Sequence, residues 1–78
     1  MFQYRMTETV FHSSCVEETH YKSYGIECVE INAGNERSVG SILDISTKRN
    51  FVETLTEKMN RQRLSPLHFH DVVEDEII

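Results

Sequence analysis

The sequence predicts an α+β domain in which an antiparallel sheet of three or four strands is followed by two C-terminal helices. Apolar residues recur with a period of two over most of residues 2–45, which is typical of half-buried strands. From about residue 46 the apolar spacing changes to a helical one. The one proline, Pro66, divides this helical part in two. Strands first and helices last is the order of the α+β class.

The first two strands are expected to form a hairpin. One face of the strand over residues 2–11 carries Phe2, Tyr4, Met6 and Val10. His12, Ser13 and Ser14 form a polar break short enough for a hairpin turn, so we expect an antiparallel strand to begin at Cys15 and run through Tyr21.

A glycine interrupts the next apolar stretch, residues 24–31. An isolated strand glycine such as Gly25 often marks a bulge or a close backbone approach, so the second strand is expected to bend or divide there. Residues 32–36 are predicted to form the next turn, because they tolerate positive φ. The last strand is expected over residues 38–45. The predicted faces of that strand are Val39, Leu43 and Ile45 on one side and Ile42 on the other.

The first helix is predicted from the recurrence of Phe51, Leu55 and Met59 at every fourth position, with Val52 beside them. Ser46 or Thr47 is the expected N-cap, and the helix is expected to end near Leu64.

A second helix is predicted to begin with Ser65 as its N-cap and Pro66 at its first position. Its apolar stripe is formed by Phe69, Val72, Val73 and Ile77.

Length and charge limit the possible functions. The chain of 78 residues is predicted to form one domain spanning residues 1–78, too small for a deep enzymatic cleft, so we expect no enzymatic activity. The net charge of −5 argues against nucleic acid as a partner. Without a long apolar run or a secretory signal pattern, the sequence predicts a cytoplasmic protein with no membrane partner.

The two cysteines are expected to be reduced and to serve as small apolar residues, since Cys15 and Cys28 lack the spacing of a redox or zinc motif. A nucleophile needs a base and an orienting group within reach. His12 and His20 could face each other across the hairpin, but histidines are common on the polar face of a sheet. We therefore predict no catalytic residues.

Possible metal ligands are concentrated near the C-terminus, at His68, His70, Asp71, Glu74 and Asp75. On a helix, positions 68, 71 and 75 share one stripe and positions 70 and 74 a neighbouring one. Imidazole and carboxylate groups can bind divalent transition metals. The favoured interpretation is a solvated polar face, because the spacing matches no zinc motif. His68 could also cap the first turn or pack on the sheet. No cofactor is expected.

Charge is distributed unevenly along the helical part. Residues 48–63 carry five cations and two carboxylates, whereas Asp71, Glu74, Asp75 and Glu76 lie where the dipole of the second helix disfavours negative charge. This placement suggests a cationic neighbour: the basic first helix of the same or a second chain, or an external partner. The alternative is a solvated polar tail.

Three segments carry a family resemblance: YGIE at residues 24–27, DIST at 44–47 and SPLHFHDVVED at 65–75. The chain resembles a family of short uncharacterised bacterial proteins, a domain of unknown function found mostly in Gram-positive anaerobes. The resemblance covers most of the chain and is most specific in the closing SPxHxxDVVED block. It implies a cytoplasmic bacterial protein and assigns no activity, substrate or catalytic residue.

These observations favour a small non-enzymatic interaction or regulatory module that self-associates as a homodimer and that can also contact another protein. Two routes to the dimer are visible in the sequence: pairing of an exposed strand edge, or burial of the apolar stripe of the last helix between two chains. The alternative function is metal or small-ligand binding through the cluster from His68 to Asp75.

Overall fold

A computed structural model describes residues 1–13 and 19–77 of the chain. Within these residues, strands β1 (Phe2–Ser13), β2 (Thr19–Asn32) and β3 (Asn35–Ser46) form an antiparallel sheet in the order β1-β2-β3. Helix α1 (Arg49–Arg61), the short 3₁₀ helix η1 (Pro66–His68) and helix α2 (Phe69–Ile77) follow. The predicted α+β class is confirmed, with three strands.

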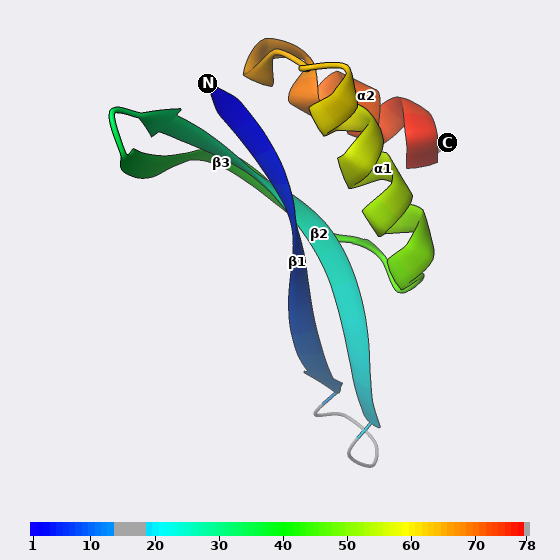
Figure 1. The fold of residues 1–78 in the computed structure, drawn as a ribbon. Helices are drawn as coiled ribbons and strands as arrows, with labels where there is room; N and C mark the ends of the chain where they lie inside the picture. Colours follow the sequence, from blue (N-terminus) through cyan, green and yellow to red (C-terminus); the bar gives the residue numbers. More distant parts are fainter. Residues whose placement is uncertain (14–18, 78) are drawn as a thin grey trace.

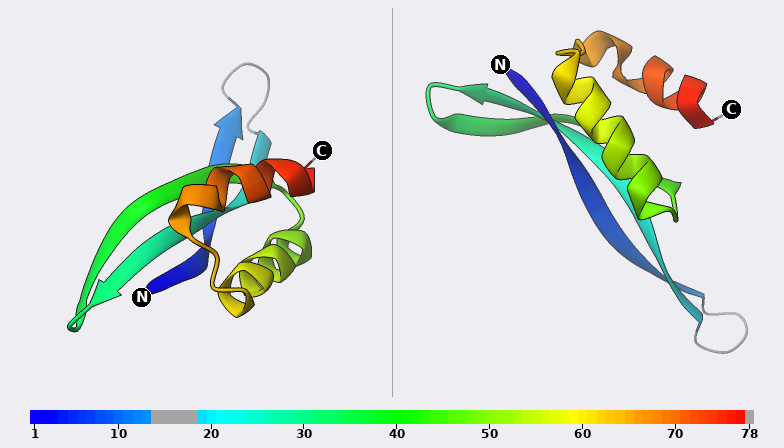
Figure 2. Two further views of the ribbon diagram at one scale, coloured as in Figure 1. Left: turned by 90° about the horizontal axis from the view of Figure 1, so that it is seen from above. Right: turned by 45° about the vertical axis from the view of Figure 1, so that its right-hand side comes forward.

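Both α-helices pack against the same part of the sheet, and the far end of the β1–β2 hairpin extends beyond them (Figures 1 and 2). No helix in the described part of the chain is long and apolar enough to cross a membrane.

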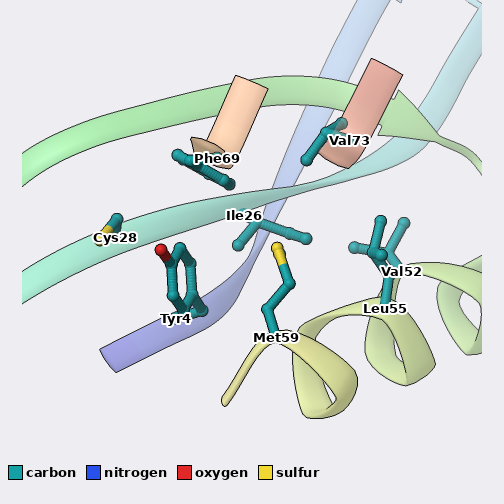
Figure 3. Close-up of a cluster of buried hydrophobic side chains, with 8 residues drawn as sticks. All are labelled: Tyr4, Ile26, Cys28, Val52, Leu55, Met59, Phe69 and Val73. Atoms are coloured by element: carbon teal, nitrogen blue, oxygen red, sulfur yellow. The ribbon is translucent and has the colours of Figure 1, made fainter. Parts of the chain in front are cut away.

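The core lies between the helices and the sheet (Figure 3). Its buried side chains come from β1, β2, α1 and α2: Tyr4, Ile26, Cys28, Val52, Leu55, Met59, Phe69 and Val73. The rings of Tyr4 and Phe69 meet edge to face with centroids 5.2 Å apart, so α2, which packs against β3, also contacts β1 through Phe69.

The first hairpin differs from the sequence prediction. His12 and Ser13 belong to β1, and Ser13 pairs with Thr19, so the predicted turn at residues 12–14 starts too early. The reason is that a strand tolerates polar residues, and neither glycine nor asparagine is present at residues 12–14 to force a turn. The predicted strand positions from Cys15 to residue 18 lie outside the described residues.

Gly25 marks an irregularity in the sheet, as predicted. Tyr24 pairs with Ser46 but Ile26 pairs with Ile42, so Gly25 alone faces three residues of β3. A Cβ atom on Gly25 would lie 2.2 Å from the carbonyl oxygen of Ile42, a distance that excludes any side chain. The strand bends there but does not divide.

The extra β3 residues at this bulge change which side chains face the core. Asp44 adopts a positive φ of 57°, and its carboxylate accepts a hydrogen bond from the buried hydroxyl of Ser23. Ile42 and Ile45 consequently both pack against the core, whereas Leu43 is exposed. The prediction that Ile45 shares a face with Leu43 was therefore wrong, because the bulge interrupts the alternation.

The predicted turn between the second and third strands is confirmed. Asn32 pairs with Asn35, and the two residues between them, Ala33 and Gly34, have positive φ angles of 52° and 84°. Two consecutive positive values are typical of the type I′ turn, whose twist matches that of the flanking strands.

Helix α1 begins later than predicted, with Lys48 as its N-cap. Ser46 is the last residue of β3, and its Oγ accepts a hydrogen bond from the Lys48 amide at 3.0 Å. Neither Ser46 nor Thr47 is therefore the cap, because the hydroxyl of Ser46 is used in the turn before the helix.

Helix α1 ends three residues before the predicted Leu64, with Gln62 as its C-cap. Arg63 has a φ of 52° and donates its amide to the carbonyl of Asn60 at 3.2 Å, and Leu64 donates to that of Met59 at 3.1 Å. This pair of bonds is the Schellman motif, with arginine at the position that usually holds glycine. The left-handed residue, rather than the later proline, ends the helix.

Ser65 caps the following turn, as predicted. Its Oγ accepts a hydrogen bond from the Leu67 amide at 3.4 Å, and Pro66 occupies the first helical position. The first turn is a 3₁₀ helix, so α2 itself begins at Phe69. Phe69 and Val73 are buried within their own chain, which removes most of the apolar stripe from the second predicted route to a dimer.

Candidate functional site

An open groove lies where the beginning of β1 meets the turn that follows α1. It has a volume of about 790 Å³. Its lining residues come from the first residues of the chain and from the end of α1: Met1, Phe2, Gln3, Asn60, Arg63, Leu64 and Ser65. Most of the accessible lining is apolar, and Met1 and Phe2 are themselves exposed. The groove therefore leaves apolar surface in contact with water.

Asn60, which lines this groove, bonds to the main chain of β1. Its Oδ1 accepts from the Tyr4 amide at 2.7 Å, and its Nδ2 donates to the Tyr4 carbonyl at 2.8 Å. Alternate residues of an antiparallel strand direct these groups away from the partner strand. The Asn60 carboxamide thus replaces a neighbouring strand at this point of the outer edge of β1.

The hydroxyl of Tyr4 fixes the other side of the groove, because it donates to the carbonyl of Leu64 at 2.8 Å. Burial raises the pKa of this hydroxyl, so it stays a donor at any physiological pH. Together with the Asn60 bonds, this contact ties the end of α1 to β1. The groove is therefore held in a defined shape.

Arg63 supplies the charge at the rim of the groove. It is exposed, and within the described residues neither it nor Arg61 forms an ion pair. An arginine in the left-handed conformation costs conformational energy that glycine would avoid. The groove thus combines apolar side chains with a guanidinium that has no carboxylate partner in the described chain.

The five predicted metal ligands are placed on η1 and α2. His68 ends η1, the other four lie on α2, and all five are exposed. Over residues 1–13 and 19–77, no three or more His, Cys, Asp or Glu side chains come close enough to hold a metal ion. The ring of His70 lies edge to face with Phe69, at a centroid distance of 5.7 Å. Metal binding stays a prediction that would need ligands from a second chain.

Of the four carboxylates on α2, one has the cationic neighbour that the charge distribution suggested. Glu76 accepts from Lys58 of α1 at 3.0 Å. Asp71, Glu74 and Asp75 form no ion pair with the described residues. Most of the negative charge on α2 is therefore left for solvent or for another molecule.

Cys28 is a free, buried thiol in contact with Tyr4. This agrees with the prediction that Cys28 is reduced and serves as a small apolar residue. Burial raises the pKa of the thiol, which disfavours the nucleophilic thiolate. Cys15 lies outside the described residues. His12 and His20 are paired in the strand register, as expected, but their side chains belong to the part of the hairpin that is not described.

The comparison with protein families covers the whole chain. The model of a family of unknown function (DUF6514) matches residues 1–78. The chain belongs to this family. The resemblance to an uncharacterised family is thereby confirmed, and membership itself assigns no activity. No curated protein and no solved structure matches the chain.

The sequence pattern does not distinguish Asn60 or Arg63 as functional residues. An asparagine on the polar side of an amphipathic helix and an arginine after its end are ordinary in a sequence. Only the path of the chain brings them to β1, so their role could not be read from the pattern.

Proposed function

We propose that this chain is a small non-enzymatic interaction module that self-associates, and that it acts in the bacterial cytoplasm. The observation that supports this function best is the open groove between β1 and the end of α1, with its apolar lining and the rim charge of Arg63. A domain of 78 residues buries only a limited apolar area in its own core. Burial of its exposed apolar surface between two chains would therefore add to its stability, which favours association.

The absence of a catalytic arrangement at the buried thiol agrees with this proposal. Burial raises the pKa of the Cys28 thiol, which disfavours the thiolate that a nucleophile needs. The groove also presents no titratable group besides Arg63 and the amino group of Met1. Such a lining suits binding better than proton transfer.

The outer edge of β1 is a second surface that agrees with self-association. Beyond Tyr4, alternation along the strand directs the amides and carbonyls of Met6, Glu8 and Val10 away from β2. Val10 is exposed, and β1 is an edge strand of the sheet. An open edge of this kind can pair with a second strand.

The test is the mass of the native chain in solution. We expect light scattering coupled to size exclusion, at micromolar concentrations, to give twice the 9.1 kDa of one chain. Sedimentation equilibrium over the same range should fit a monomer–dimer equilibrium. A mass that stays at that of one chain at every concentration would contradict the proposal.

Metal binding through His68, His70, Asp71, Glu74 and Asp75 is the second candidate function. All five side chains are exposed, so they could bind a metal together with ligands from a second chain, since no three of the described side chains lie close enough within one chain. Calorimetric titration of the chelator-treated protein with zinc, nickel and manganese tests this function. Sub-micromolar binding that is lost in His70→Ala and weakens as the pH falls through about 6.5 would support it. No heat and no thermal shift with any of the three metals would exclude it.

A further inference from the structure

We infer that the groove of one chain receives α2 of a second copy, with Ile77 on its apolar lining and Glu74 at Arg63. This inference rests on the proposed self-association and specifies the surfaces that make it. In this dimer α2 of each chain binds in the groove of the other chain. The same two contacts therefore form twice.

Charge complementarity selects α2 as the occupant. Residues 48–63 carry Lys48, Arg49, Lys58, Arg61 and Arg63 against Glu53 and Glu57, a net charge of +3. Residues 70–77 carry four carboxylates and no lysine or arginine, a net charge of −4 with His70 neutral. Within the described chain only the bridge from Lys58 to Glu76 joins the two sets, at 3.0 Å. Arg49 pairs with Glu53 of its own helix, whereas in the described chain Arg61 and Arg63 on one side and Asp71, Glu74 and Asp75 on the other form no ion pair and are available to a second chain.

The helical period of α2 determines which side chains are available. Phe69 and Val73 face the core, and Glu76 lies next to α1 through its bridge to Lys58. Because an α-helix turns by about 100° per residue, positions i, i+4 and i+7 share one face. On α2 these positions are His70, Glu74 and Ile77. His70 and Glu74 are exposed, and 52% of Ile77 remains exposed. This face presents one large apolar side chain beside one carboxylate.

The groove has the matching groups. Met1, Phe2 and Leu64 supply an apolar surface for the Ile77 side chain. Arg63 provides a guanidinium that can bind a carboxylate in bidentate geometry. The left-handed conformation of Arg63 is consistent with such a role, because glycine would end α1 with less strain but would supply no charge.

A reciprocal arrangement closes as a two-fold dimer, because each chain uses its groove and its α2 once. A one-sided arrangement would leave one groove and one α2 free and would continue into longer assemblies. The number of chains in the assembly therefore distinguishes the two.

Charge exchange tests the proposed pair. Arg63→Glu places a carboxylate opposite Glu74, and Glu74→Lys places an ammonium opposite Arg63. Each variant alone should weaken the dimer about tenfold or more, because like charges meet at both contacts. An equimolar mixture should recover dimers close to the native affinity, since both contacts of a mixed dimer pair opposite charges. Sedimentation equilibrium and native mass spectrometry, which separates mixed from single-variant dimers, measure this recovery.

Two further variants control for folding and for unspecific charge effects. Arg63→Gly suits the left-handed backbone, so the variant should fold as the native chain does. Because it lacks the guanidinium, it should dimerise more weakly than the native chain. Glu57→Lys makes the same charge change as Glu74→Lys at an exposed position of α1 outside the groove lining, and it should leave the dimer unchanged. Circular dichroism confirms that each variant is folded.

The outcomes separate the inference from the proposed function. A native chain that is monomeric throughout overturns both. A native dimer that persists in both single variants, or a mixture that shows no recovery, overturns the pairing of Arg63 with Glu74 and leaves self-association intact. Loss of the dimer in Val10→Glu but in neither groove variant would assign it to the β1 edge instead. Growth beyond two chains with concentration would overturn the reciprocal arrangement.

Discussion

The two halves of the β1–β2 hairpin have similar sequence patterns but different surroundings. In the helix-covered half, β1 contributes Tyr4 to the core with 2% of its surface exposed. In the projecting half, Val10 continues the same alternation but is 47% exposed. The far end of the hairpin extends beyond both helices (Figure 1). The period of two thus determines the strand, whereas burial depends on what packs above it. Three substitutions test this difference, and a fourth, with the smallest expected effect, tests the opposite face of the sheet.

Phe69→Ala should leave a cavity between α2 and the helix-covered half of the sheet. Truncating a buried phenylalanine costs about 3–5 kcal/mol, which is comparable to the total stability expected for a core of this size. We therefore expect the variant to be largely unfolded at 25 °C in circular dichroism and urea titration. The matched change in the projecting half, Val10→Ala, should shift the free energy of unfolding by no more than about 0.5 kcal/mol. Equal losses in the two variants would show that both halves are covered in solution.

Gly25→Ala tests the position where the two halves meet. The added methyl group would overlap the Ile42 carbonyl, a backbone atom that can move only with the strand, so we expect a loss of about 1–3 kcal/mol. Gly40→Ala is the control, because its Cβ would meet only the Phe69 ring at an ordinary 3.9 Å. Urea titration of both variants measures the difference. A Gly25→Ala variant as stable as Gly40→Ala would contradict the close contact between β2 and β3.

Asn60→Ala should leave the outer edge of β1 without hydrogen-bond partners at Tyr4, as that edge is in the projecting half. It leaves the amide and carbonyl of Tyr4 without the bonds at 2.7 and 2.8 Å, at a cost of about 1–3 kcal/mol. The rate of hydrogen exchange at the Tyr4 amide should rise by a larger factor than the loss of global stability alone would produce. Asn60→Asp keeps an acceptor for that amide and should protect it better than alanine does. Unchanged exchange in both variants would argue against the carboxamide as a replacement strand.

Glu36→Gln should have the smallest effect and concerns the sheet face opposite the helices. Arg5 of β1 reaches across β2 to Glu36 of β3, with Nη2 to Oε1 at 2.8 Å. Hydrogen bonds from Arg5, and then its charge, hold the pKa of the Glu36 carboxyl below its ordinary value. Because the folded pKa is the lower one, this contribution is present above the ordinary pKa and is lost as the pH falls through the folded value.

The stability difference between the native chain and Glu36→Gln should therefore be present at pH 7 and disappear at acidic pH. Urea titrations at both pH values measure it. Both side chains are exposed, so added salt should reduce the difference as well. Glu57→Gln, which changes a carboxylate without a described partner, is the control. A difference that grows on acidification would contradict the assigned pKa direction.

The sequence alone determined the class of the fold and most of its elements. The periods of apolar residues identified β1, β3 and both helices, since each pattern reflects how the local backbone directs its side chains. Gly25 was predicted correctly because only a residue without a side chain allows so close an approach of two backbones. The turn at residues 32–36 was predicted correctly because its residues tolerate positive φ, which Ala33 and Gly34 adopt. Ser65 and Pro66 identified the start of the last helical segment through local capping chemistry.

The tertiary structure decided the features that depend on distant parts of the chain. The left-handed conformations of Asp44 and Arg63 shifted the face of β3 and ended α1. Arginine does not signal such a conformation, and aspartate, although it adopts it more often than most residues, does not require it. Asn60 lies 56 residues from Tyr4 in the chain, and only packing of α1 on the sheet brings them together to form the groove. Local patterns specify elements through nearby backbone geometry, whereas a site is made from contacts between elements, which the order of residues along one element does not contain.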